Sequence, residues 1–279
     1  METYIQITIA LKDDPLAGIL IAQLSECGFE GFEEEDDCLQ AYINEKQFPA
    51  AAFKKIISDN GIAHTKKIIA PKNWNEEWEK NFQPVIVDDF CGIRASFHPP
   101  FLELKHEITI TPKMSFGTGH HATTFLMIRA ISNIDCKEKT VLDFGTGTGV
   151  LAILAEKCGA KKIIAVDNDD WSIENAAENI KDNNCSKITL LKADSIEQEC
   201  SLDIILANIN KNIIQQHFQS FKQHLPPHGV LILSGLLGTD YGEIEKEAYR
   251  NDFRIFSKQE KENWICIVLT GVHDSLLKS

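Results

Sequence analysis

The sequence lacks the features of secreted scaffolds, zinc modules and membrane proteins. Its eight cysteines stand far apart and form no C-x-x-C pair, which argues against a disulfide framework and a zinc site. The longest run without a charged residue, Gln223–Thr239, is interrupted by Pro226-Pro227-His228-Gly229 and is excluded as a membrane span. Met1–Leu11 has no basic stretch ahead of an apolar one, so it is not typical of a signal peptide. These absences favour a protein of the reduced cytoplasm.

Positive charge is also scarce. The 28 Lys and Arg residues stand against 41 Asp and Glu residues, so the formal net charge is −13. Nucleic-acid binders usually present a basic face, because contacts to phosphate supply much of their affinity. The balance therefore disfavours direct binding to nucleic acid and favours a basic protein as partner. With 279 residues, 43% of them hydrophobic, the chain has room for one large domain and a small one.

One glycine-rich turn organises the larger part of the chain. Thr140–Leu142 is typical of a short buried strand, and Val150–Lys157 has the apolar spacing of a helix. Between them, glycines occupy alternate positions from Gly145 to Gly149. A dinucleotide-binding turn needs G-x-G-x-x-G, with its third glycine at the position of Val150. The turn, with Asp143 just before it, instead resembles the first motif of the S-adenosylmethionine (AdoMet) methyltransferases.

Acidic and amide residues follow the neighbouring predicted strands. Asp167 comes directly after the strand predicted at Lys162–Val166, about 20 residues beyond the turn, where a carboxylate accepts hydrogen bonds from both ribose hydroxyls. The alternative is that Asp167 only caps the next helix. Asp194 and Asn208 end the two strands that follow. Because ligands of open parallel sheets bind at the carboxyl ends of the strands, we expect these side chains around one cofactor site.

The predicted elements define two domains. Residues 1–70 show the series strand, helix, strand, strand, helix, strand, which is the ferredoxin-like α+β arrangement. Residues 71–82 are predicted as a linker helix with an aromatic residue at every fourth position. From 83 to 279 strands and helices alternate, which predicts an α/β domain built on a mostly parallel sheet. The aromatic residues of the linker are Trp74, Trp78 and Phe82.

Nearly the whole chain resembles one known family, the ribosomal protein L11 methyltransferases (PrmA). The most specific segment is 116–124, F-G-T-G-H-H-A-T-T, which is similar to the family's F-G-T-G-T-H-P-T-T. His120 and Ala122 depart from that pattern, and Thr146 replaces the frequent cysteine of the glycine turn. Residues 208–211, N-I-N-K, stand where many members have N-I-L-A, which alters the wall beside the acceptor site.

The resemblance implies a Rossmann-like, seven-stranded methyltransferase domain behind the small domain, with S-adenosyl-L-methionine as cofactor. It places Thr124, Gly145, Asp167 and Asn208 at the family's cofactor-contacting positions. Thr124 has a plainer alternative, since it or its neighbour would cap the helix predicted at Phe125–Ile131.

The resemblance also implies the reaction. Family members methylate lysine side-chain amines, and the N-terminal amine, of large-subunit ribosomal protein L11. A lysine with a pKa near 10.4 is protonated at about pH 7, so the site must favour the neutral amine and aim its lone pair. Asn208 is the candidate catalytic residue, because its side-chain carbonyl can accept N–H hydrogen bonds. Orientation would supply most of the acceleration, so no strong general base is required. The alternative for Asn208 is a turn residue at a strand end.

Other functions stay open. Residues 208–210 distantly resemble the N-P-P-Y motif of amide and exocyclic-amine methyltransferases, so an enzyme acting on RNA or on a protein glutamine is the second candidate. Lys211 stands where that motif has the tyrosine that would stack on a flipped base, and this weakens the RNA-directed candidate. A non-catalytic AdoMet-binding module would have a decayed glycine turn, and this turn is intact. The adjacent His120 and His121 are not predicted to bind a metal, because their side chains diverge and no third ligand is apparent.

The small domain is predicted to recognise the protein substrate. Residues 1–70 carry no cofactor motif, so the prediction rests on elimination. They contain twelve acidic and six basic residues, a net charge of −6 that suits a basic ligand. The linker at 71–82 would let this domain move relative to the active site, so that several lysines of one partner are reached.

Overall fold

The chain divides into two compact units, Met1–Lys80 and Asn81–Ser279. Apart from Phe82, the helix predicted at 71–82 lies outside the described residues, and the roles given to 1–70, 71–82 and 83–279 stay predictions. No helix in the described part of the chain has the length and apolar character that crossing a bilayer demands. The computed structural model describes residues 3–11, 20–21, 23–25, 27–29, 31–35, 38–69, 82–112, 117–196 and 201–271.

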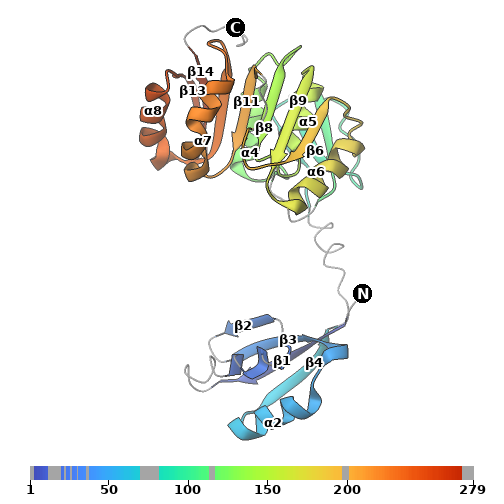
Figure 1. The fold of residues 1–279 in the computed structure, drawn as a ribbon. Coiled ribbons are helices and arrows are strands. Elements are labelled where there is room, and N and C mark those ends of the chain that lie inside the picture. Colours follow the sequence, from blue (N-terminus) through green and yellow to red (C-terminus); the bar gives the residue numbers. More distant parts are fainter. Residues whose placement is uncertain are drawn as a thin grey trace. The chain divides into compact units, whose positions relative to one another are not determined.

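The smaller unit contains a four-stranded antiparallel sheet in the order β2-β3-β1-β4 (Figure 1). In β1 the side chains of Ile5, Ile7 and Ile9 are buried and those between them are less so, which is the period of two expected of a strand. Along the chain the order is strand, helix, strand, strand, helix, strand, and residues 20, 21 and 23–25 are helical. The other elements are β1 (Tyr4–Ala10), β2 (Gly31–Glu35), β3 (Cys38–Asn44), η1 (Glu45–Gln47), α2 (Ala50–Asn60) and β4 (His64–Ile69).

The larger unit is built on a seven-stranded sheet in the order β10-β9-β8-β11-β12-β14-β13. The first five of these strands are parallel, and β14 runs antiparallel between β12 and β13. The predicted Rossmann-like α/β sheet is confirmed. The chain moves outward from β8 to β10 and then returns to β11 beside β8, so the strand order reverses there. The strands are β8 (Thr140–Phe144), β9 (Lys162–Asp167), β10 (Ile188–Lys192), β11 (Ile204–Asn208), β12 (Val230–Leu237), β13 (Arg254–Lys261) and β14 (Trp264–Thr270).

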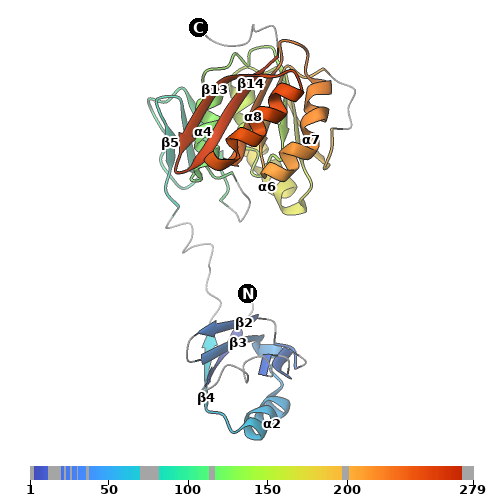
Figure 2. The same ribbon diagram turned by 90° about the vertical axis from the view of Figure 1, so that its left-hand side faces the viewer.

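Helices cover both faces of this sheet, and α7 and α8 lie together on one face in Figure 2. Alternate residues of one strand therefore enter different cores: Val141 packs with α4 and α5, and Leu142 with α7 and α8. Burial on both sides explains why these strands are continuous apolar runs in the sequence. The helices are α4 (Ala122–Ile131), α5 (Val150–Lys157), α6 (Asp170–Asp182), α7 (Lys211–His224), η2 (Gly238–Asp240) and α8 (Tyr241–Arg250).

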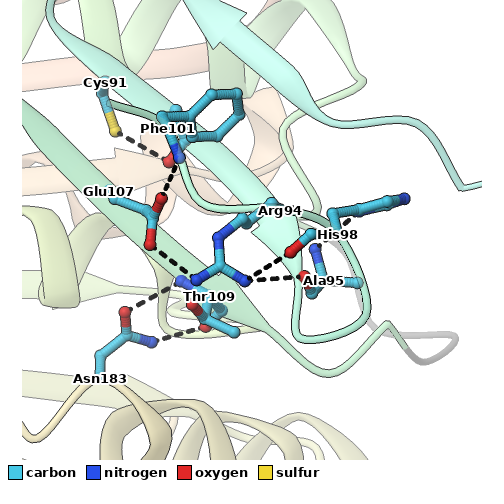
Figure 3. A network of polar contacts seen from close by, with 9 residues as sticks. Cys91, Arg94, Ala95, His98, Phe101, Glu107, Thr109 and Asn183 are labelled. Carbon is cyan, nitrogen blue, oxygen red and sulfur yellow. Dashed lines mark hydrogen bonds and ion pairs between the residues drawn. The ribbon is translucent and has the colours of Figure 1, made fainter. Parts of the chain in front are cut away.

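A three-stranded sheet packs against α4, α5 and α6; its strands are β5 (Val85–Val87), β6 (Cys91–Ala95) and β7 (His106–Ile110). Arg94 donates hydrogen bonds to Glu107 at 2.8 Å and to the carbonyl oxygens of Ala95 and His98 at 3.1 and 3.2 Å (Figure 3). Glu107 also accepts from the backbone N–H of Phe101 at 2.6 Å. The hydrogen bond from the guanidinium lowers the pKa of Glu107. These contacts fix the connection between β6 and β7. They therefore also fix the position of β7, from which the chain continues to α4.

Candidate active site

A pocket of about 750 Å³ lies where the strand order reverses, at the carboxyl ends of β8, β9, β11 and β12. Open parallel sheets bind ligands at this place. Three of the predicted cofactor residues, Gly145, Asp167 and Asn208, line it together with Asp194. Thr124 is fully buried behind Asn208, whose side-chain Nδ2 donates to the Thr124 hydroxyl at 3.4 Å.

The glycine turn is held tightly against the neighbouring strands. Gly145 has φ +76°, and its backbone N–H donates to the carbonyl oxygen of Val166 at 2.9 Å. A Cβ added at Gly145 would lie 2.3 Å from Cγ2 of Ile209, so no larger residue fits without a shift. Gly149 also has a positive φ and is the N-cap of α5. The turn thus brings backbone rather than side chains to the pocket.

Asp167 is the last residue of β9 and is half-buried at the pocket. Its Oδ2 accepts from the N–H of Gly147 at 2.9 Å and its Oδ1 from the N–H of Asp169 at 3.1 Å. The cap of α6 is Asp169, whose Oδ2 accepts from Ser172, so the capping alternative for Asp167 is wrong. An ionised carboxylate has about four acceptor positions, so two protein bonds orient Asp167 and leave capacity for a ligand.

Asp143 lies beneath the turn and is 1% exposed. Its Oδ2 accepts from the Thr146 hydroxyl at 2.6 Å and from the N–H of Ala152 at 3.1 Å, while its buried Oδ1 has no protein partner. Burial raises the pKa of Asp143 to about 7, the negative charge of Asp167 adds to the rise, and the two hydrogen bonds oppose it. The hydroxyl of Thr146, at a position where the family often has cysteine, is therefore the side-chain group that holds the Asp143 carboxyl.

Asn208 ends β11 and lines the pocket with the two residues that follow it. Its buried Oδ1 has no protein partner. The backbone then passes so close to Gly235 (φ +83°) that a Cβ there would lie 2.2 Å from the carbonyl oxygen of Ile209. The turn after β11 is thus confined by Gly145 on one side and by Gly235 on the other, and Asn208 is held in place.

An aromatic wall, formed by His121 and Trp264, completes the pocket. The two rings meet edge to face with centroids 4.8 Å apart. His121 is the N-cap of α4, and its Nδ1 lies 3.3 Å from the backbone N of Thr123. The helix therefore begins at Ala122, and Thr124 lies within its first turn, so the capping alternative for Thr124 is wrong.

Sequence reasoning did not find this wall. It quoted His121 within the segment 116–124 and rejected it as a metal ligand, but gave it no role in the pocket. Trp264 reaches the pocket because β14 pairs with β12, where Leu237 lies opposite Trp264. Such a pairing leaves no local signal in the sequence.

Comparison with known proteins agrees with this geometry. The family model described as Ribosomal protein L11 methyltransferase (PrmA) matches residues 18–271. The chain belongs to this family. The ribosomal protein L11 methyltransferase of Bacteroides thetaiotaomicron is 38% identical over 260 residues, 90% of this chain and 93% of that protein. The corresponding protein of Chlorobaculum tepidum is 38% identical over 278 residues, 95% of this chain and 96% of that protein.

Solved structures support the family. The crystal structure of the ribosomal protein L11 methylase from Lactobacillus delbrueckii subsp. bulgaricus is 30% identical, with a TM-score of 0.65, over 69% of this chain and 100% of that one. A methyltransferase from Pyrococcus furiosus, 18% identical with a TM-score of 0.50 over 58% of this chain and 87% of that one, shows the fold alone. This PrmA family member is an AdoMet-dependent protein methyltransferase.

The raised pKa of Asp143 predicts how stability depends on pH. The carboxyl ionises near pH 3.8 in the unfolded chain but at about 7 in the folded protein. Because the folded state keeps a proton that the unfolded state releases, the free energy of unfolding falls as the pH rises from 3.8 to about 7. Asp143→Asn keeps an oxygen for both hydrogen bonds and cannot ionise. Its stability relative to the unmodified protein should rise across this window by roughly 1.4 kcal/mol per pH unit at most.

The measurement is denaturant unfolding of both proteins without ligand, at several pH values across that window. A stability difference that stays constant with pH would show that Asp143 ionises at its ordinary pKa in the folded protein.

Proposed function

We propose that this protein methylates lysine side-chain amines, and the N-terminal amine, of large-subunit ribosomal protein L11. The names of the relatives at 36–38% identity support this substrate. The observation that carries the proposal is the buried Oδ1 of Asn208, an acceptor without a protein partner at the wall of the pocket. An amine that donates an N–H would satisfy it, and an unpaired buried acceptor is otherwise costly by about 1–3 kcal/mol.

The residues of the pocket fit the cofactor. Asp167 keeps acceptor capacity for two ribose hydroxyls, and Gly145 leaves room at the turn. Asp143 does not line the pocket and supports the turn from below through Thr146 and Ala152. Thr124 is proposed as a cofactor residue from the resemblance alone; its hydroxyl accepts from Asn208, so it also orients that side chain.

The bound cofactor supplies an electrophilic methyl group on a positively charged sulfur. Asn208 accepts an N–H of the neutral amine and so directs the nitrogen lone pair at that methyl carbon. The cofactor would give up this methyl group to the amine and keep the electrons of the C–S bond, and the methylated amine would lose its extra proton to water. The aromatic wall of His121 and Trp264 would receive the apolar stem of the lysine. Helix α4 holds the wall near Asn208. His121 caps this helix, and Thr124 in its first turn contacts Asn208.

The structure weighs against the RNA-directed alternative at Lys211. Its Nζ lies 3.0 Å from Oδ1 of Asp240 and 3.3 Å from Oε2 of Glu243. The hydrogen bonds to these two carboxylates raise the pKa of Lys211. Its charge is thus paired within the protein, and Lys211 itself has no ring to stack on a flipped base.

The function is tested by incubation with isotope-labelled AdoMet and the dissociated ribosomal proteins, followed by mass spectrometry. We expect methyl groups on lysines and on the N-terminal amine of L11. Label found instead on RNA, or on a protein glutamine, would replace the proposal with the alternative reaction.

Asp167 and Asn208 should separate cofactor binding from chemistry. Asp167→Ala removes acceptors for two ribose hydroxyls, each worth about 0.5–1.5 kcal/mol, and should weaken AdoMet binding by about 10- to 100-fold. Asn208→Ala should lower kcat on L11 by more than it weakens AdoMet binding, because it orients the amine. Calorimetric titration with AdoMet and steady-state kinetics measure the two quantities.

The matched control is Asp170→Ala, three residues after Asp167 at the first residue of α6, where the carboxylate pairs with the exposed Lys192. It should leave both quantities unchanged. Equal losses of affinity and kcat in Asn208→Ala would make Asn208 a cofactor residue, and unchanged affinity in Asp167→Ala would remove the ribose assignment.

We also propose that residues 1–70 recognise the basic substrate protein. Their net charge of −6 supports this, and among them Glu33 is exposed on β2. Truncation to residues 73–279 should retain AdoMet binding and lose most methylation of intact L11. Raising the salt concentration should slow methylation by the full chain, because the attraction of opposite charges acts on association. Full activity of the truncated protein on intact L11 would exclude this recognition role.

A further inference from the structure

We infer that Asn179 is a positioning residue that joins the cofactor side of the pocket, Gly145 and Asp167, to its acceptor side, His121 and Asn208. Asn179 lies on α6, is 0% exposed, and sits outside the pocket lining. It reaches the reaction only through the backbone groups that it binds. The inference rests on the proposed function, which assigns the ribose to Asp167 and the amine to Asn208.

The side-chain amide of Asn179 bridges two segments far apart in the sequence. Its Oδ1 accepts from the N–H of Thr111, just after β7, at 2.8 Å. Its Nδ2 donates to the carbonyl oxygen of Thr148 in the glycine turn at 2.8 Å, and to Oδ1 of Asn175 at 3.3 Å. A backbone N–H can only donate and a carbonyl can only accept, so only one orientation of the amide satisfies both segments.

Thr148 carries the connection onward. Its side chain is fully buried, and its hydroxyl donates to the carbonyl oxygen of Gly117 at 2.8 Å. A Cβ at Gly117 (φ +108°) would lie 2.7 Å from that hydroxyl, so the two segments are in close contact. Thr111 and Gly117 therefore both depend on Thr148, the first through Asn179 and the second directly.

Both sides of the pocket start from these bonds. The neighbour of Thr148, Gly147, donates its N–H to Asp167. On the other side, Gly117 lies four residues before His121, which caps α4 and forms half of the aromatic wall. Asn179 thus fixes the carbonyl of Thr148. Thr148 lies between the Gly147 N–H that binds Asp167 and the segment that leads to His121.

Asn183 provides a matched control. It lies one helical turn beyond Asn179 and bonds to the same strand, with its Oδ1 accepting from the N–H of Thr109 at 3.0 Å and its Nδ2 donating to the Thr109 carbonyl oxygen at 2.6 Å (Figure 3). Its remaining bond is to the carbonyl oxygen of Asn179 within the helix. Asn183 therefore anchors β7 to α6 without any bond to the glycine turn.

The experiment compares Asn179→Leu with Asn183→Leu in the full chain, by AdoMet calorimetry, kcat on L11 and thermal unfolding. Asn179→Leu removes the side-chain bonds to Thr111, Thr148 and Asn175. The loss of the bond to the glycine turn should weaken AdoMet binding and lower kcat by about tenfold each. Asn183→Leu should lower the melting temperature to a similar extent and change affinity and kcat by less than about twofold.

A second pair of variants, at Thr148, tests the other end of the connection. It tests the inference on its own if Asn179→Leu does not fold. Thr148→Val removes only the hydroxyl and should lower kcat, whereas Thr148→Ser keeps it and should restore kcat. If Asn179→Leu, or Thr148→Val, loses stability without a change in affinity or kcat, the residue is merely structural and the inference fails. Failure of the proposed function is distinguishable, because Asp167→Ala would then bind AdoMet normally or unmodified protein would not methylate L11.

Discussion

The site depends on one steric constraint, the passage of Ile209 between two glycines. Its side chain lies against Gly145 and its carbonyl oxygen against Gly235, each closer than any Cβ would permit. The turn that follows β11 is thereby pressed onto the turn that follows β8, at the two neighbouring strands where the strand order reverses. This contact fixes the backbone at Asn208, and the hydrogen bond to Thr124 orients its side chain.

Around this contact the protein keeps polar atoms that it does not satisfy itself. Asp143 and Asn208 each retain one buried oxygen without a protein partner, on adjacent strands of the same sheet. Gln259, on β13 of the same sheet, keeps a further buried oxygen of this kind, and of the three residues Asn208 is the one that lines the pocket. Buried polar atoms are normally paired, and an exception at a pocket wall is typical of a group reserved for a ligand.

Local patterns predicted most of the fold and half of the site. The helix after the glycine turn was predicted with the bounds observed, and the strand predicted at Lys162–Val166 is one residue longer, because apolar periodicity and turn glycines are local. Asp167 and Asn208 were found because strand ends are visible in the sequence. The metal interpretation of His121 was considered and rejected, and Trp264 was not singled out, since the wall exists only through the pairing of β14 with β12. Asn179 was missed because an asparagine inside a helix gives no sign of its distant partners.

The position of β14 has a consequence for the order in which the pocket can be assembled during synthesis. The last strand of the sequence lies between β12 and β13, so β13 has no neighbour in the sheet until β14 is inserted. Trp264, at the start of that strand, is made well after β8, β9 and the glycine turn between them. A growing chain can therefore fold the glycine turn and its acids early, but the aromatic wall closes only after β14 has been made.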